Sequence, residues 1–209
     1  MASLVPHLSL DVGSFNSSAV TQEDVSFIFS SYFTWTINSS SLLLDWENPT
    51  VLRVFNEESI FPTEYNVNPV EITEENPTWE IYVIQDASGI GITHPIHLHG
   101  HDFWVIGQDT GEFDLATSSL NLINPPRRDV ASLPGNGYLA IAFKKDNPGS
   151  WLLHCHIAWH ASEGLAMQFV ETEAEIVSSL PTASVMIDAC SAWSTYTETD
   201  LYEQEDSGV

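Results

Sequence analysis

The chain is poor in basic residues and in cysteine. Its 209 residues include 5 Lys and Arg against 29 Asp and Glu, a formal net charge of −24, and only 2 Cys. Such an acidic surface repels phosphate backbones and anionic lipids, so we expect no nucleic acid and no membrane among the partners. No apolar run approaches the roughly 20 residues of a membrane span.

The N-terminus shows no leader pattern, so we expect no signal peptide in this chain, and several common catalytic motifs do not occur. The N-terminal sequence MASLVPHLSLDV lacks the basic and then apolar pattern of a secretory signal. The Gly-x-Ser-x-Gly of serine hydrolases, the Gly-rich phosphate loop and the His-Glu-x-x-His of zinc proteases do not occur. The chain is nevertheless 43% hydrophobic, which excludes a disordered protein and allows a sizeable core.

Short segments with apolar side chains at every second position predict an all-β fold. Residues 25–29 and 33–37 alternate in this way. Further strand-like runs lie at residues 79–85, 102–107, 138–144, 151–156 and 164–171. Asn-Pro and Pro-Gly pairs between them mark turns, so the pattern favours a β-sandwich or barrel. A short helix is expected near Glu171 to Ser179, and the polar, acidic sequence from Ser191 onward predicts an extended tail.

Seven of the eight histidines fall into two dense clusters. The first is the run HPIHLHGH at residues 94–101, and the second is HCHIAWH at residues 154–160. A lone histidine is more often a core or surface residue than a ligand, and we interpret His7 in that way. Two dense clusters, one of which contains a cysteine, indicate metal binding.

Strand geometry divides these clusters into two donor sets. Because successive side chains of a strand point to opposite faces, His154 and His156 share one face while Cys155 points to the other. His97 and His99 share a face in the same way. The two predicted sets are therefore His94, Cys155 and His160, and His97, His99, His154 and His156.

The chemistry of both sets favours copper. Two imidazoles and one thiolate match the trigonal set of a blue-copper electron-transfer site. Zinc accepts the same donors but usually takes a fourth, and structural zinc sites show closely spaced cysteine pairs that are missing here. Four imidazoles without a neighbouring carboxylate suit copper and O₂ chemistry. Cys155 and its neighbours join the two sets covalently, which provides a short route for electrons.

These motifs closely resemble a known family. HPIHLHGH and HCHIAWHASEGL are similar to the two C-terminal copper motifs of laccases, and NPPRRDV (124–130) and DNPGSWLLHCH (146–156) resemble the ascomycete fungal branch. The resemblance implies the third domain of a multicopper oxidase, a cupredoxin-like Greek-key β-sandwich or barrel with short helices. We expect this domain at residues 25–180, after an N-terminal extension or linker at 1–24 and before an acidic tail at 181–209.

The resemblance also implies a role for each donor. The type 1 ligands would be His94, Cys155 and His160, the type 2 ligand His97, and the type 3 ligands His99, His154 and His156. Electrons would enter at His160 and pass through Cys155 to His154 and His156. His101 matches a histidine that does not ligate. Leu165 lies where some relatives have an axial Met, and leucine cannot ligate, so a three-coordinate copper of higher potential is expected.

Aromatic and apolar residues near these motifs are candidates for substrate contact. Phe33-x-Trp35 resembles a motif that lines the phenol cleft of fungal laccases, and Ile90, Ile92 and Trp159 would extend its wall. The alternative is that these side chains belong to an ordinary sandwich core. The final DSGV resembles an ending that ascomycete laccases thread into the channel to the trinuclear cluster; the alternative is a solvated tail.

Two further copper motifs of the family, both N-terminal, do not occur in this sequence, and His7 is the one histidine left over. Cys190 resembles a cysteine that bonds to the first domain of the family, and Asn16 and Asn38 begin glycosylation sequons that hint at a secretory origin. The predicted function is therefore that of a secreted laccase, which oxidises phenols or aromatic amines and reduces O₂ to water.

This chain would supply the C-terminal domain, with the missing N-terminal laccase domains as its partner. The alternatives are a type 1 electron-transfer fragment without oxidase activity, a non-catalytic interaction fragment, and another multicopper oxidase such as an ascorbate or bilirubin oxidase.

Overall fold

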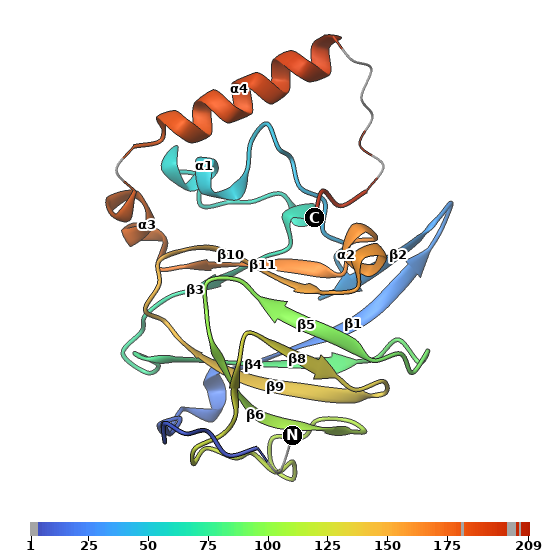
Figure 1. The fold of residues 1–209 in the computed structure, drawn as a ribbon, viewed down its shortest axis with the longest axis vertical. Coiled ribbons are helices and arrows are strands. Elements are labelled where there is room, and N and C mark those ends of the chain that lie inside the picture. The colour runs from blue at the N-terminus through green and yellow to red at the C-terminus, as the bar shows by residue number, and fades with distance from the viewer. Residues whose placement is uncertain (1–3, 181, 200–203, 205) are drawn as a thin grey trace.

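Two β-sheets packed face to face form the body of the protein in the computed structural model (Figure 1), which describes residues 4–180, 182–199, 204 and 206–209. The six-stranded sheet has the order β2-β1-β4-β9-β6-β7. Its strands are β1 (Val20–Phe29), β2 (Phe33–Ile37), β4 (Trp79–Asp86), β6 (Phe103–Thr110), β7 (Arg127–Arg128) and β9 (Gly137–Lys144). The five-stranded sheet has the order β3-β11-β10-β5-β8. Its strands are β3 (Val67–Val70), β5 (His94–Leu98), β8 (Val130–Leu133), β10 (Gly149–Cys155) and β11 (Ala166–Glu171).

The main core fills the space between the two sheets and includes part of the first donor set. Phe103, Phe143 and Phe169 are fully buried there, together with Cys155 and Leu165. This two-sheet arrangement confirms the predicted all-β sandwich, and every strand-like run named from the sequence lies on or overlaps a strand.

A second core covers the outer face of the six-stranded sheet. The segment around Val12 and the loop around Phe113 pack there against alternate residues of β4, β6 and β9. Because both faces of β9 are covered, its sequence GYLAIAFK reads as a nearly continuous apolar run. β1 begins at Val20, inside the segment 1–24 that was expected to be an extension, and the division of the chain at residues 24 and 180 stays a prediction.

Helices gather at the opposite end of the molecule from the N-terminus, beyond β10 and β11 (Figure 1). They are α1 (Thr50–Phe55), α3 (Glu173–Ser179) and α4 (Ser184–Thr199), while α2 (Ala158–Ser162) follows β10, and two 3-10 turns, η1 and η2, lie at Ser17–Ala19 and Thr63–Tyr65. Val54 of α1 and Ile176 of α3 pack on Val170 of β11, which confirms the helix expected near residues 171–179.

The prediction of an extended tail from Ser191 onward is wrong for residues 191–199, which belong to the helix α4, and residues 200–203 and 205 of that tail lie outside the described part of the chain. No Gly or Pro interrupts this stretch. Its threonine hydroxyl groups donate to carbonyls of the preceding turn, as Thr195 Oγ1 does to Ser191 O at 2.9 Å. The ring of Trp193 packs on Trp46 with centroids 4.7 Å apart, which holds the helix against the body.

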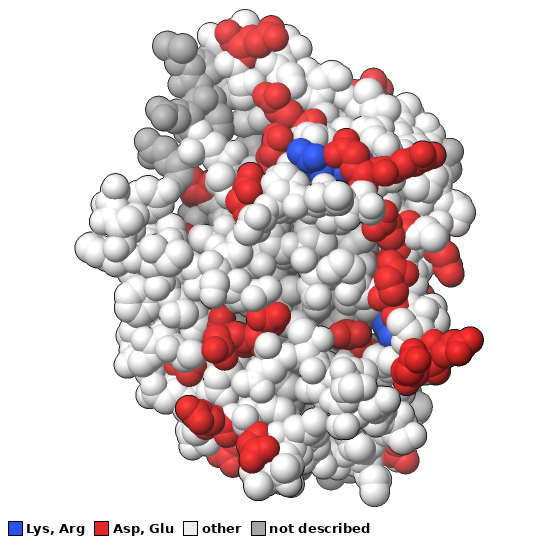
Figure 2. All heavy atoms as spheres, turned by 180° about the vertical axis from the view of Figure 1, so that it is seen from behind, with Lys and Arg blue, Asp and Glu red and all other residues white. Residues whose placement is uncertain are grey.

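The surface carries the expected excess of negative charge. Acidic side chains are spread over the face drawn in Figure 2, and basic side chains appear there in only a few places. Among the described residues, no helix combines the length and apolar character needed to cross a bilayer.

Candidate metal centre

The structure brings His94, Cys155 and His160 together in one compact group. The two Nδ1 atoms of the histidines lie 3.2 Å apart, and each lies 3.7 Å from Cys155 Sγ. These three donor atoms form a nearly equilateral triangle, and all three side chains are buried. A single ion at the centre of the triangle would contact all three atoms.

Three elements position this group. His94 opens β5, Cys155 ends β10 and His160 lies in α2, the short helix that follows. The Cys155 amide donates to Leu165 O at 3.0 Å, and the Leu165 amide donates to His160 O at 2.9 Å. These two hydrogen bonds connect the backbone of Leu165 to that of Cys155 and His160. Leu165 is fully buried and lies in the same core cluster as Cys155.

Burial favours the uncharged form of all three donors. It lowers the pKa of His94 to about 4, with a further lowering from His160. It also lowers the pKa of His160 and raises the pKa of the Cys155 thiol to about 11. A thiol in such surroundings becomes a thiolate when a cation takes the place of its proton, which is the behaviour of a soft-metal ligand.

The donor chemistry of this group fits copper. Two imidazoles and one thiolate form a trigonal set, whereas structural zinc sites are four-coordinate. Burial also shields the group from water.

The second predicted set lies on the other face of the same strands. In the antiparallel ladder of β5 and β10, His97 is directly opposite His154, and Ile96 is opposite Cys155. His99 Nε2 lies 3.2 Å from His154 Nε2, and the donor atoms of His97, His99 and His154 lie within 4.8 Å of one another. The alternation predicted from the sequence thus matches the placement of both sets.

His156 lies at the edge of this second set rather than within its triangle. Its ring centroid is 5.6 Å from that of His154 and 5.8 Å from that of His97. Burial is the largest cause that lowers the pKa of His99 and of His154, and neighbouring imidazoles lower them further. Neutral imidazoles are the form that binds metal.

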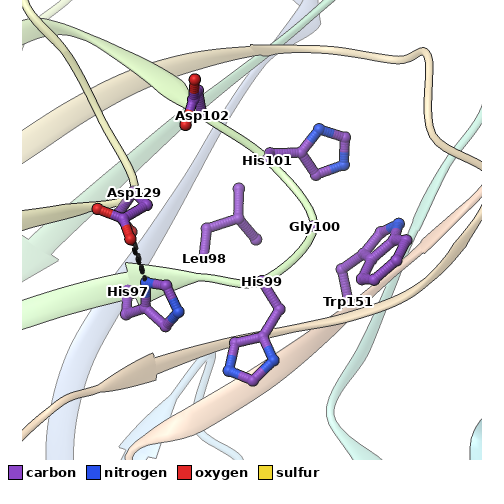
Figure 3. Close-up of a pocket in the computed structure, with 8 residues that line it drawn as sticks. All are labelled: His97, Leu98, His99, Gly100, His101, Asp102, Asp129 and Trp151. Atoms are coloured by element: carbon purple, nitrogen blue, oxygen red, sulfur yellow. Dashed lines mark hydrogen bonds and ion pairs between the residues drawn. The ribbon is translucent and has the colours of Figure 1, made fainter.

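An open depression of about 570 Å³ adjoins the second set (Figure 3). The imidazoles of His97 and His99 point in one direction on its rim, while His101 and Trp151 lie on its other side. Unlike the triangle around Cys155, this set therefore faces solvent. Among the described residues, the donors that lie within ligand distance of one another in this set are all imidazoles.

Two acidic residues near the second set were not singled out from the sequence. His97 Nδ1 donates to the backbone carbonyl of Asp129 at 2.6 Å, which leaves its Nε2 free for a metal. His101, predicted not to ligate, has its Nε2 2.9 Å from Glu171 Oε2, and both side chains are buried. Asp129 lies in the quoted motif NPPRRDV, but Glu171 is distant in sequence and nothing in the pattern marks it.

The five candidate substrate residues occupy different environments. Trp35 is 2% exposed, and its ring lies 4.8 Å from the His94 ring and 4.9 Å from the His160 ring. Phe33 is partly buried and packs on Trp35. Ile90, Ile92 and Trp159 are exposed, and Trp159 adjoins His160 in α2.

The C-terminal residues Asp206–Val209 dock on the end of α2. Ser207 is buried, its amide donates to Ser162 O at 2.8 Å, and its hydroxyl donates to Ala161 O at 2.6 Å. The chain end is thus anchored to the described body rather than solvated along its length. Cys190 of α4 is a partly exposed free cysteine.

Comparisons with known proteins identify similar sequences and structures. A family profile described as multicopper oxidase matches residues 43–175. The chain is 61% identical over its whole length to laccase-2 of Botryotinia fuckeliana, and it covers 36% of that protein. Its structure is similar to that of the laccase from Botrytis aclada, with a TM-score of 0.91 and 59% identity over all of this chain and 38% of the other.

A more distant likeness is to Fet3p, a multicopper oxidase that functions in iron import. The TM-score is 0.77, with 25% identity over 90% of this chain and 38% of that one. The chain therefore spans little more than a third of the length of these relatives. The likeness to the Botrytis aclada laccase confirms the cupredoxin-like fold.

Proposed function

Because this chain belongs to the multicopper oxidase family, we propose that it is the C-terminal domain of a laccase. The complete enzyme would oxidise phenols or aromatic amines and reduce O₂ to water with four electrons. The observation that carries the proposal is the back-to-back placement of two donor sets, one with a thiolate and one of imidazoles, on opposite faces of β5 and β10. The peptide bonds that flank Cys155 connect the two sets.

Each donor then has a role. The type 1 ligands are His94, Cys155 and His160, the type 2 ligand is His97, and the type 3 ligands are His99, His154 and His156. Copper, when bound, supplies the one-electron redox chemistry and the reduction of oxygen. The residues themselves hold the donors in place: the core around Cys155 excludes water, and the carbonyl of Asp129 fixes the tautomer of His97.

Phenolic or aromatic-amine substrates would approach the type 1 set on the side of α2. Trp159 is 67% exposed beside His160, and Ile90 and Ile92 are exposed in the loop that leads into His94. These side chains offer apolar and aromatic surface for a ring to pack on. Trp35 backs the two imidazoles from inside, so its role is to support them.

The chain by itself has a second candidate function, as an electron-transfer module. The type 1 donors all come from this chain, whereas the exposed imidazole set needs further ligands, which the two N-terminal motifs of the parent enzyme would supply. A chain on its own would then bind copper and exchange electrons without reducing oxygen. The parent would be secreted, a proposal supported by the resemblance and by the exposed sequons at Asn16 and Asn38.

The test is copper loading of the purified chain, followed by absorption spectroscopy, metal analysis and an oxygen electrode. We expect an intense visible thiolate-to-copper band, and no phenol-dependent oxygen uptake by the chain alone. The full-length parent, measured in parallel, is expected to show both. A chain that bound copper without this band would contradict the type 1 assignment, and a parent without oxygen uptake would contradict the laccase assignment.

A further inference from the structure

A buried carboxylate lies beside the loop that leads into the type 1 donors and belongs to neither donor set. Asp86, the last residue of β4, is 3% exposed. Its Oδ1 accepts hydrogen bonds from the amide of Ser88 at 3.0 Å and from the hydroxyl of Ser88 at 2.6 Å. Its Oδ2 accepts from the amide of Asn136 at 2.6 Å. Three donors from two separate segments thus meet on one carboxylate.

These two segments flank His94 on both sides. Residues 87–93 run from Asp86 directly into His94, and Asn136 lies in the turn that follows Leu133, the residue paired with His94 in the ladder of β5 and β8. The two segments also touch, since a Cβ placed on Gly135 would lie 2.2 Å from the carbonyl oxygen of Gly91. Asp86 therefore fixes the backbone on either side of a type 1 donor.

The buried position of Asp86 also has an electrostatic consequence. The carboxylate is 3% exposed, and its hydrogen-bond partners lie on the two segments that flank His94. A buried carboxylate is weakly screened, so its field favours positive charge on the neighbouring donor set.

We propose that Asp86 is a positioning residue of the type 1 site, which holds the His94 loop in place and lowers the reduction potential of the bound copper. Bound Cu(II) carries one more positive charge than Cu(I), so a nearby buried anion stabilises the oxidised form. Its second effect is on the substrate side, because the loop it anchors carries Ile90 and Ile92. The inference rests on the proposed function, since it requires copper at His94, Cys155 and His160.

The test is the midpoint potential of the copper-loaded chain in a matched set of variants. Asp86→Asn keeps an oxygen acceptor but removes the charge, and we expect a higher potential with the visible band retained. Asp86→Glu restores the charge and is expected to return the potential towards that of the wild type. Asp24→Asn is the control, because this substitution removes the same charge from an exposed residue. Asp24 lies in β1, where it is paired with Gln85 of β4, the neighbour of Asp86. The potential of this control is expected to stay unchanged, as solvent screens the charge of Asp24.

The outcomes separate this inference from the proposed function. An unchanged or lower potential in Asp86→Asn, with a wild type that shows the visible band, would overturn the role of Asp86 and leave the laccase proposal standing. A wild type without copper or without the band would overturn the type 1 assignment and the effect on potential with it. Amide hydrogen exchange at Ser88 and Asn136 in the metal-free chain tests the anchoring separately: we expect Asp86→Ala to accelerate it, and unchanged exchange would refute the anchoring.

Discussion

His94 and Cys155 are fully buried and His160 is 7% exposed, whereas His99 and His156 lie at the surface. Apart from His160 of α2, the donors of both groups nevertheless lie in β5 and β10 or directly after them, and the two groups differ by one step of the strand alternation. The face that looks into the sandwich is surrounded by core residues from both sheets. The opposite face borders the open depression in Figure 3.

The difference shows what each set requires. A set inside the core receives its geometry from packing that is already complete in this chain, so its donors are held before any metal binds. A set on an open face has imidazoles on one side only, and under the proposed function other ligands would close it. The same alternation of side chains would then produce one site whose donors all come from this chain and one that is part of a larger site.

The largest expected effect is that of Cys155→Ser on the buried set. A serine hydroxyl cannot replace the thiolate, so we expect complete loss of the visible charge-transfer band in the copper-loaded chain. Cys190→Ser is the matched control, since Cys190 is the other cysteine and lies far along the chain in α4, and it should leave the band unchanged. A Cys155→Ser variant that kept the band would show that the buried set is not the coloured site.

A second prediction tests whether core packing supports the buried set. Trp35 is 2% exposed and contacts the rings of His94 and His160, so Trp35→Ala should cost about 3–5 kcal/mol of unfolding free energy. Trp159→Ala is the control, because Trp159 is 67% exposed, and it should change stability by less than about 0.5 kcal/mol. Urea unfolding of the metal-free variants measures both. Equal costs at the two positions would mean that the core does not hold the buried set.

A third prediction separates the two sets by the protons that they release. Because burial raises the pKa of the Cys155 thiol to about 11, the thiol is protonated at pH 8, and Zn²⁺ binding to the buried set should release about one proton per ion. The imidazoles of His99 and His154 have lowered pKa values and are already neutral there, so the open set should release none.

The proton release has a defined pH dependence. It should be near one per ion at pH 8 and fall as the pH approaches the thiol pKa of about 11, because the thiol then loses its proton before zinc binds. Titration in a weak buffer with a pH indicator measures it, and Cys155→Ser provides the control without release. Equal release in the wild type and in Cys155→Ser would contradict the assignment of the thiol to the buried set.

Much of this arrangement follows from the sequence because period-two alternation is a local property. The positions of the strands depend on residues that are adjacent in the sequence. The same is true of the opposite directions in which Cys155 and His154 point. The edge strand β3 was not foreseen, since Pro69 lies inside it and proline weakens a strand pattern. It is tolerated there because β3 pairs with β11 on one side only.

The parts that the sequence did not predict depend on contacts between distant segments. The pair of His101 and Glu171 joins positions far apart in the chain, and so do the hydrogen bonds from Asn136 to Asp86. Helix α4 was expected to be extended over residues 191–199 because their composition is polar. Its packing of Trp193 on Trp46 was not visible in a pattern of single residues.

The substitution Leu165→Met is expected to have the smallest effect on the fold. It tests whether residue 165 faces the copper bound to the buried set. Leu165 is fully buried, receives the Cys155 amide at its carbonyl and lies in the same core cluster as Cys155, so a longer side chain here could offer an axial donor. The exchange conserves volume and should cost less than about 1.5 kcal/mol. A methionine sulfur adds a long, weak axial ligand, and we expect a lower midpoint potential with the band retained. Leu139→Met is the control, because Leu139 is equally buried but lies in β9. If both variants kept the wild-type potential, Leu165 would not face the bound copper, and the buried set would be open to a different axial neighbour.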